Sequence, residues 1–195
     1  CTIGCHPHES SKIEEGYLIA LENMAKDDKV VGIGETGLDY YYNHSKKDKQ
    51  KKCFIEQIEL ANELNLPVVI HNRNSDKDMY EILNKFRPKG VIHCFSSNID
   101  FAKQIIDLGI IISFTGIITF KNSHLDEVIQ NINLEDFMLE TDSPYLTPEP
   151  FRGKRNEPKN VSYIAEKIAS IKNISIDETI YHTTQNALNL FDRMK

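Results

Sequence analysis

The sequence predicts an α/β fold of about six parallel strands with surrounding helices. Six short apolar runs, among them VVGIG, PVVI and IIISF, have the composition of buried strands. Between them, apolar residues recur at helical spacing, and this alternation is typical of a parallel sheet covered by helices. A TIM (β/α)8-type barrel takes about 250 residues. We therefore expect the 195-residue chain to form a single, incomplete domain over 1–195 that lacks about two N-terminal βα units.

The first half of the chain is predicted to contain four strands and three helices. Strands are expected at 1–5, 30–34 and 90–94, and Pro67 opens another. A capping box, Ser11 with Glu14, predicts a helix that carries Tyr17, Leu18, Leu21 and Met24. Two more helices are expected at 46–65, with Phe54, Ile58 and Ala61 on its core face, and at 76–86.

The second half is predicted to add two strands and four helices. Asn98 caps a helix that ends near Gly109, and a fully apolar strand follows at 110–114. A helix around 123–132 leads to a strand at 137–141. Four prolines make 143–160 an extended loop. Helices at 160–172 and 176–190 close the chain, the second one behind a capping box of Ser175 with Glu178.

Composition excludes several classes of protein. No apolar stretch reaches the ~18 residues of a membrane span, and the four cysteines form no CxxC pair, which favours a reduced cytoplasmic or nuclear protein. A formal charge of −6 argues against coating nucleic acid by bulk positive charge, but it allows local phosphate contacts. The chain starts inside a strand without a signal peptide, so we expect a cut N-terminus and unknown targeting.

Four ionisable residues come after separate apolar strands: Glu35, His71, His93 and Asp142. In a parallel α/β fold such strand ends share one face, where active sites lie. Singly, each has an ordinary alternative, namely a helix cap, a core histidine or an Asx turn. Together, two imidazoles and two carboxylates favour a divalent-metal site. Because such a metal makes hydroxide available at neutral pH, we expect metal-assisted hydrolysis.

Further residues are candidates for substrate contact. His6 and His8 form an HxH after the first strand, and we favour helix entry or phosphate contact over metal ligation. Arg73 is placed to clamp an anion or to form a surface salt bridge. Arg152 and Arg155 in RGKR form a phosphate-contacting loop or simply a solvated one.

Three other features have mainly structural interpretations. Tyrosines 40–42 either stack on bases or pack their loop. The lysine-rich run 46–52 is expected to be a solvated helix face. Cys94 is expected in the core, because strand alternation turns it away from the side of His93.

Motifs along essentially the whole chain resemble the TatD family of metal-dependent deoxyribonucleases. They are GCHPHE, VVGIGETGLDYYYN, LPVVIHNR, GVIHCFSS, LETDSPYLTPEPFRGKRNEP and NALNLF. The resemblance implies a TIM barrel of the amidohydrolase type with one or two divalent ions (Mg, Mn or Zn) and exonuclease-like hydrolysis of DNA by a metal-bound hydroxide that attacks phosphorus. It implies that Glu35 bridges the metals, that His71 and His93 complete one site, and that Asp142 belongs to the other and handles the proton of the attacking water. His6 and Arg73 match positions near the substrate phosphate.

The family pattern also includes an earlier strand with its own HxH metal pair, which this sequence does not show. We therefore expect an open barrel that self-associates through strand edges at 1–5 and 137–141 and is weak as a nuclease. Two alternatives stay open: hydrolysis of a small ester or amide, and a catalytically impaired fragment that binds metal or nucleic acid. Arg73 and the RGKRNEP loop favour a phosphate substrate over a neutral one.

Overall fold

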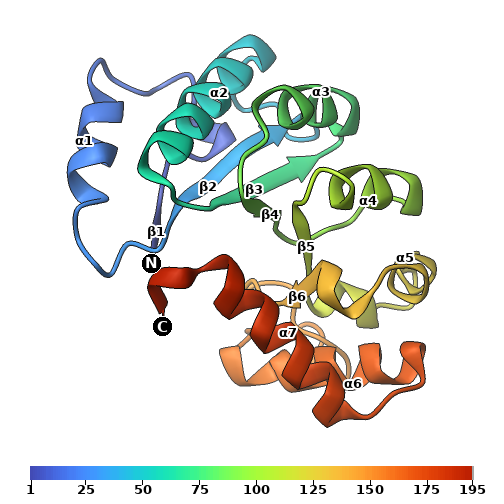
Figure 1. The fold of residues 1–195 in the computed structure, drawn as a ribbon. Helices are drawn as coiled ribbons and strands as arrows, with labels where there is room; N and C mark the ends of the chain where they lie inside the picture. The colour runs from blue at the N-terminus through green and yellow to red at the C-terminus, as the bar shows by residue number, and fades with distance from the viewer. Residues whose placement is uncertain (195) are drawn as a thin grey trace. The chain divides into compact units, whose positions relative to one another are not determined.

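The computed structural model describes residues 1–194, which divide into two compact units (Figure 1). The first unit comprises Cys1–His93, Asp107–Ile110 and the C-terminal segment from Leu188. The second comprises Cys94–Ile106 and Ile111–Ala187. Each unit contains parallel strands and the helices that follow them, as the sequence predicts.

The first unit is built on four parallel strands that pair in chain order: β1 (Thr2–Ile3), β2 (Gly32–Asp39), β3 (Val68–Arg73) and β4 (Gly90–Ile92). Its helices are α1 (Tyr17–Met24), α2 (Lys47–Leu64) and α3 (Asp76–Phe86), with a 3-10 turn at Pro7–Glu9. Figure 1 shows α2 and α3 running along β2 and β3. Core side chains on these elements are inaccessible to solvent: Ile33, Leu38, Phe54, Ile58 and Ile70.

A β-bulge in β2 surrounds Glu35. Between two paired positions β2 advances three residues, from Ile33 to Thr36, while β3 advances two, from Val68 to Ile70. An extra residue in one strand bends it locally and re-aims a side chain. Glu35 is accordingly the half-buried residue in a strand whose other members are buried.

Two glycines flank this bulge and let β3 approach closely. Gly34 has a φ of +151°, and a Cβ there would lie 2.6 Å from the carbonyl oxygen of Val69. Gly37 has a φ of +143°, and a Cβ there would lie 2.0 Å from the carbonyl oxygen of His71. Only glycine meets both demands, the backbone angle and the contact distance. The GETG sequence therefore brings β2 and β3 together around Glu35.

The second unit contains the parallel strands β5 (Ile111–Phe114) and β6 (Phe137–Leu139). Its helices are α4 (Ile99–Ile106), α5 (Asp126–Asn131), α6 (Val161–Lys172) and most of α7 (Ile176–Leu190), and 3-10 turns occur at Gly116–Thr119, Leu134–Asp136 and Pro158–Asn160. The rings of Phe114 and Phe137 pack with centroids 5.4 Å apart, and both are fully buried. A last 3-10 turn, Asp192–Met194, belongs to the first unit, where Arg193 donates to the carbonyls of Ala25 and Val30.

Most element predictions are confirmed, including the caps Asn98 and Ser175, whose side chains accept from the backbone N–H groups of Phe101 and Glu178. The Ser11 capping box is wrong: α1 begins after Gly16, because the Ser11 N–H donates to the Ser45 hydroxyl instead. Strand β2 does not stop at residue 34 but continues to Asp39. Over residues 1–194, no helix combines the length and the apolarity that a membrane crossing requires.

Candidate metal centre

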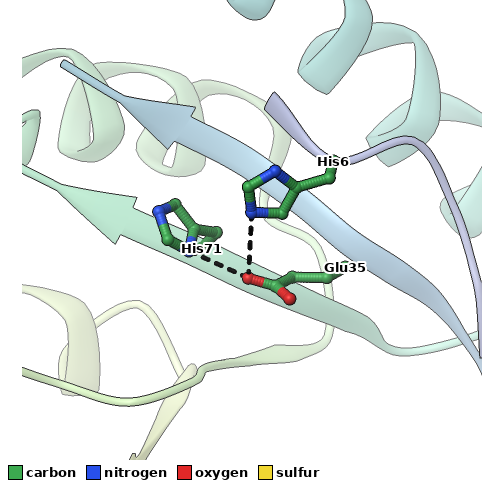
Figure 2. A group of neighbouring side chains, drawn as sticks. All are labelled: His6, Glu35 and His71. Carbon is green, nitrogen blue, oxygen red and sulfur yellow. Dashed lines mark hydrogen bonds and ion pairs between the residues drawn. The ribbon is translucent and has the colours of Figure 1, made fainter. Parts of the chain in front are cut away.

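One carboxylate oxygen in the first unit meets three imidazoles. The Oε1 atom of Glu35 lies 3.4 Å from His6 Nε2, 2.8 Å from His71 Nδ1 and 2.6 Å from His93 Nε2. Figure 2 shows the ring of His6 pointing at this oxygen from the segment after β1, and the ring of His71 pointing at it from β3. His93 follows β4 directly. Three strands and a bulge thus supply one convergent set of donors.

A second carboxylate, Asp39, extends the cluster. It ends β2, is fully buried, and its Oδ2 lies 2.9 Å from His8 Nε2 and 3.0 Å from His71 Nε2. The ring of His71 therefore lies between two carboxylates, with Nδ1 toward Glu35 and Nε2 toward Asp39. A carboxylate that accepts from the remote ring nitrogen fixes the orientation and tautomer of a ligating histidine.

Histidines are concentrated in this unit. Five of the seven in the chain (His6, His8, His44, His71 and His93) lie within ring contact of at least one other of the five, with centroids 4.3–6.2 Å apart. Isolated structural histidines do not pack ring against ring around shared carboxylates in this way. The arrangement therefore favours the metal interpretation over single core histidines.

Two buried glutamines of α2 hold the loops that carry these residues. Gln57 accepts from the N–H of Cys5 at 2.7 Å and donates to its carbonyl at 3.1 Å, which fixes the residue before His6. Gln50, one heptad earlier, accepts from the Asp39 N–H at 2.7 Å and donates to the Asp39 carbonyl at 3.0 Å. Both side chains are fully buried, so α2 acts as a positioning helix for the site.

The electrostatics keep both carboxyl groups ionised. Burial raises the pKa of Glu35, but the hydrogen bonds from His6, His71 and His93 outweigh it and hold the pKa well below its usual range. For Asp39, burial also raises the pKa, and hydrogen bonds from the Tyr42 N–H, His8 and His71 lower it to a value below the ordinary one. Both groups are therefore available as anionic ligands or acceptors at neutral pH.

This donor set fits a divalent metal ion. Ligand atoms of His6, Glu35 and His71 lie within 4.8 Å of one another, and His93 adds a fourth through the same oxygen. Imidazole nitrogen with carboxylate oxygen is a ligand combination that zinc, manganese and related metals accept. The sequence analysis favoured a phosphate role for His6, but its Nε2 shares the Glu35 oxygen with the other two histidines.

Asp142 lies in the second unit, in a turn after β6. Its φ is +53°, and its carbonyl accepts from the Tyr145 N–H at 2.8 Å. The buried Asn156 holds this turn: its Nδ2 donates to the carbonyls of Thr141 and Tyr145 at 2.8 and 2.6 Å. An amide that donates to both sides of the turn keeps Asp142 in one backbone conformation.

The three arginines predicted to contact phosphate are exposed. Arg73 ends β3 in the first unit, and its guanidinium lies 4.4 Å from the ring centroid of Tyr41. In the second unit Arg152 lies 4.1 Å over the Phe120 ring, and Arg155 precedes Asn156. Cys94 is only half-buried, so the prediction of a core position is wrong; its N–H donates to the Glu140 carboxylate, which also contacts the Ser113 hydroxyl.

Sequence reasoning missed Asp39, Gln50, Gln57 and Asn156. Asp39 lies beyond the strand predicted at 30–34, because the apolar pattern breaks at GETG, and Gln50 lies within the lysine-rich run that is predicted to be solvated. The signal that would have found the glutamines is their spacing of seven on the core face of α2, beside Phe54 and Ile58.

Comparisons with known proteins agree with this geometry. The family described as TatD related DNase matches residues 1–192. The Bacillus subtilis protein YabD, named an uncharacterized metal-dependent hydrolase, is 42% identical over 97% of this chain and 76% of its own length. Escherichia coli YcfH, with the same description, is 41% identical over 96% of this chain and 72% of its own.

Solved structures show the same relationship. The crystal structure of YJJV, a TatD homologue from E. coli K12, superposes with a TM-score of 0.92 at 28% identity, covering 98% of this chain and 76% of that one. A TatD family hydrolase from Entamoeba histolytica gives a TM-score of 0.86 at 31% identity, covering 97% and 73%. The E. coli phosphotriesterase homology protein, at 17% identity and a TM-score of 0.68, shares the fold.

Proposed function

Because this chain belongs to the TatD-related DNase family of metal-dependent hydrolases, we propose that it hydrolyses phosphodiester bonds of DNA from a strand end. The observation that carries the proposal is the single Glu35 oxygen that faces His6, His71 and His93. The exposed Arg73, which ends the strand that bears His71, supports a phosphate-containing substrate.

We assign the metal ligands to Glu35, His71 and His93, with His6 added from the geometry. Asp142, from the motif it shares with the family, is the proton acceptor. A divalent ion, when bound, supplies Lewis-acid chemistry that activates water at neutral pH. Mg²⁺, Mn²⁺ and Zn²⁺ are all compatible with this mixture of carboxylate and imidazole donors.

The residues of the chain then have separate tasks. Asp39 accepts from Nε2 of His71 and thereby presents Nδ1 on the side of Glu35. Asp142 takes the proton of the attacking water as a bond forms between the water oxygen and phosphorus. Arg73, Arg152 and Arg155 bind phosphate oxygens. The phosphorus–oxygen bond to the leaving nucleoside breaks, and that oxygen is protonated by solvent.

A 5′-labelled oligonucleotide incubated with Mg²⁺, Mn²⁺ or Zn²⁺ tests the proposal. We expect metal-dependent shortening from one end, no shortening in EDTA, and none with Glu35→Gln, which keeps size but removes the charge of the carboxylate. A protein that hydrolyses small esters or amides with these metals, yet leaves the oligonucleotide intact, would contradict a nuclease and assign the site to small molecules.

A further inference from the structure

Three consecutive tyrosines after β2 differ in their surroundings. The hydroxyl of Tyr40 donates to Asp78 at 2.7 Å, and Lys47 lies 4.2 Å from its ring centroid. Tyr41 and Tyr42 are 57% and 52% exposed, and over residues 1–194 neither hydroxyl has a hydrogen-bond partner. Tyr40 thus packs its loop, whereas the two following rings are exposed without a structural contact for their polar ends.

The two exposed rings form a fixed pair with Arg73. Tyr41 meets Tyr42 edge to face, with centroids 4.9 Å apart and planes at 89°. The guanidinium of Arg73 lies 4.4 Å from the Tyr41 centroid and 5.1 Å from the Tyr42 centroid. Tyr42 also stacks on His44 at 5.7 Å and 9°. With Tyr42 packed between neighbours, Tyr41 offers the more open ring.

This pair is attached to the metal centre by a single carboxylate. The N–H groups of Tyr41 and Tyr42 donate to Asp39 Oδ1 at 3.0 and 2.9 Å. The other oxygen of Asp39 contacts His8 and His71. Because one buried side chain holds both features, the rings are ordered before any ligand arrives, and binding loses little conformational entropy.

We propose that Tyr41, backed by Tyr42 and Arg73, is a stacking subsite for an unpaired nucleobase of the substrate; the inference rests on the proposed function. An exposed aromatic face next to an exposed guanidinium matches a nucleotide, which has a planar base and a phosphate. A base inside a duplex has both faces stacked, so this subsite takes an unpaired base and selects single-stranded ends.

The test pairs protein variants with a matched pair of oligonucleotides. One is a fluorescein-labelled thymidine strand, and the other has an abasic residue in place of each base. Binding by fluorescence anisotropy is measured in EDTA, so that it is independent of turnover. Because stacking on an aromatic ring strengthens binding by about tenfold per base, we expect wild type to prefer the strand with bases by at least that factor. Tyr41→Ala should lose the preference, and Tyr41→Phe, which keeps the ring, should retain it.

The control variant is Tyr181→Ala, which removes a tyrosine that is 63% exposed on α7; it should behave as wild type. Equal binding of the two strands by wild type, or an equal loss for both strands in Tyr41→Ala, would overturn the stacking subsite and assign the tyrosines to loop packing. Metal-dependent cleavage of DNA in that same protein would leave the proposed function standing. Absence of both binding and cleavage would overturn both proposals.

Discussion

The two units hold their ionisable residues in different ways. In the first unit, Glu35 and Asp39 are linked through the ring of His71, so charged groups hold one another in place. In the second unit, the turn around Asp142 is held by the neutral amide of Asn156, which donates to backbone carbonyls. The first arrangement is a set of ligand atoms, and the second is a set of backbone supports.

This difference indicates a division of labour. Among the proposed ligands, Glu35 and His71 lie on strands whose backbone is fixed by ladder hydrogen bonds, and His6 and His93 lie in the segments that follow strands. The arginines that we propose to contact DNA lie on a strand end and on a loop. Substitutions of the proposed ligands in the first unit should therefore abolish metal binding, whereas substitutions in the loop of the second unit should spare it.

The largest effect is expected for Glu35→Ala. It removes the oxygen shared by three imidazoles, so both metal binding and hydrolysis should fall by about a thousandfold or more. The side chain is outside the fully buried core, and the thermal midpoint of the metal-free protein should change by only a few degrees. Isothermal titration with Mn²⁺ and a melting curve check both statements. An Mn²⁺ affinity equal to that of wild type would contradict the assignment of Glu35 as a metal ligand.

A change at Gly37 tests how far the site depends on the close approach of β2 and β3. In Gly37→Ala the new Cβ would lie 2.0 Å from the His71 carbonyl oxygen, so the free energy of unfolding should fall by about 3 kcal/mol or more. Gly16→Ala is the matched control, because Gly16 also has a positive φ, +88°, but nothing within 4 Å. Its cost should be about 1–2 kcal/mol. If chemical denaturation shows equal losses in the free energy of unfolding for the two variants, β3 can move away from the new Cβ at little cost.

Asp39→Asn should weaken metal binding without abolishing it. The amide keeps the size of the side chain, but it leaves Nε2 of His71 and of His8 without an anionic acceptor. Loss of such a supporting carboxylate typically costs about 10- to 100-fold in metal affinity. Competition against a zinc chelator measures this, and an unchanged affinity would mean that His71 is oriented by Glu35 and packing alone.

Asn156→Ala is the counterpart in the second unit. It removes both amide donors to the turn around Asp142. We expect hydrolysis to fall by about tenfold, as hydrogen bonds of about 1 kcal/mol each are lost, while Mn²⁺ affinity by titration stays within about twofold of wild type. A parallel loss of Mn²⁺ affinity would contradict the division of labour, because it would mean that this turn contributes to metal binding.

The sequence predicted the strand–helix alternation because apolar runs and capping residues are local signals, and α3, α6 and α7 begin and end within a residue or so of the expected bounds. The pattern failed where local signals conflict with tertiary contacts. Gly34 and Gly37 break the apolar pattern of β2, so its continuation to Asp39 was missed. Whether His6 faces Glu35 depends on the hydrogen bonds of Gln57, which no local pattern shows.

The smallest effect is expected for the exposed arginines, and it appears as a salt dependence. Each phosphate contact that is lost should reduce the slope of log affinity against log salt for single-stranded DNA by about 0.7–1. We therefore compare Arg73→Ala, Arg155→Ala and the double variant, all with intact metal binding. Because the guanidinium of Arg73 also lies against Tyr41, that variant should lose affinity at every salt concentration, whereas Arg155→Ala should lose it mainly at low salt. Slopes equal to wild type in the double variant would assign both side chains to structure, and the contribution of the second unit to DNA binding would then rest on Arg152 alone.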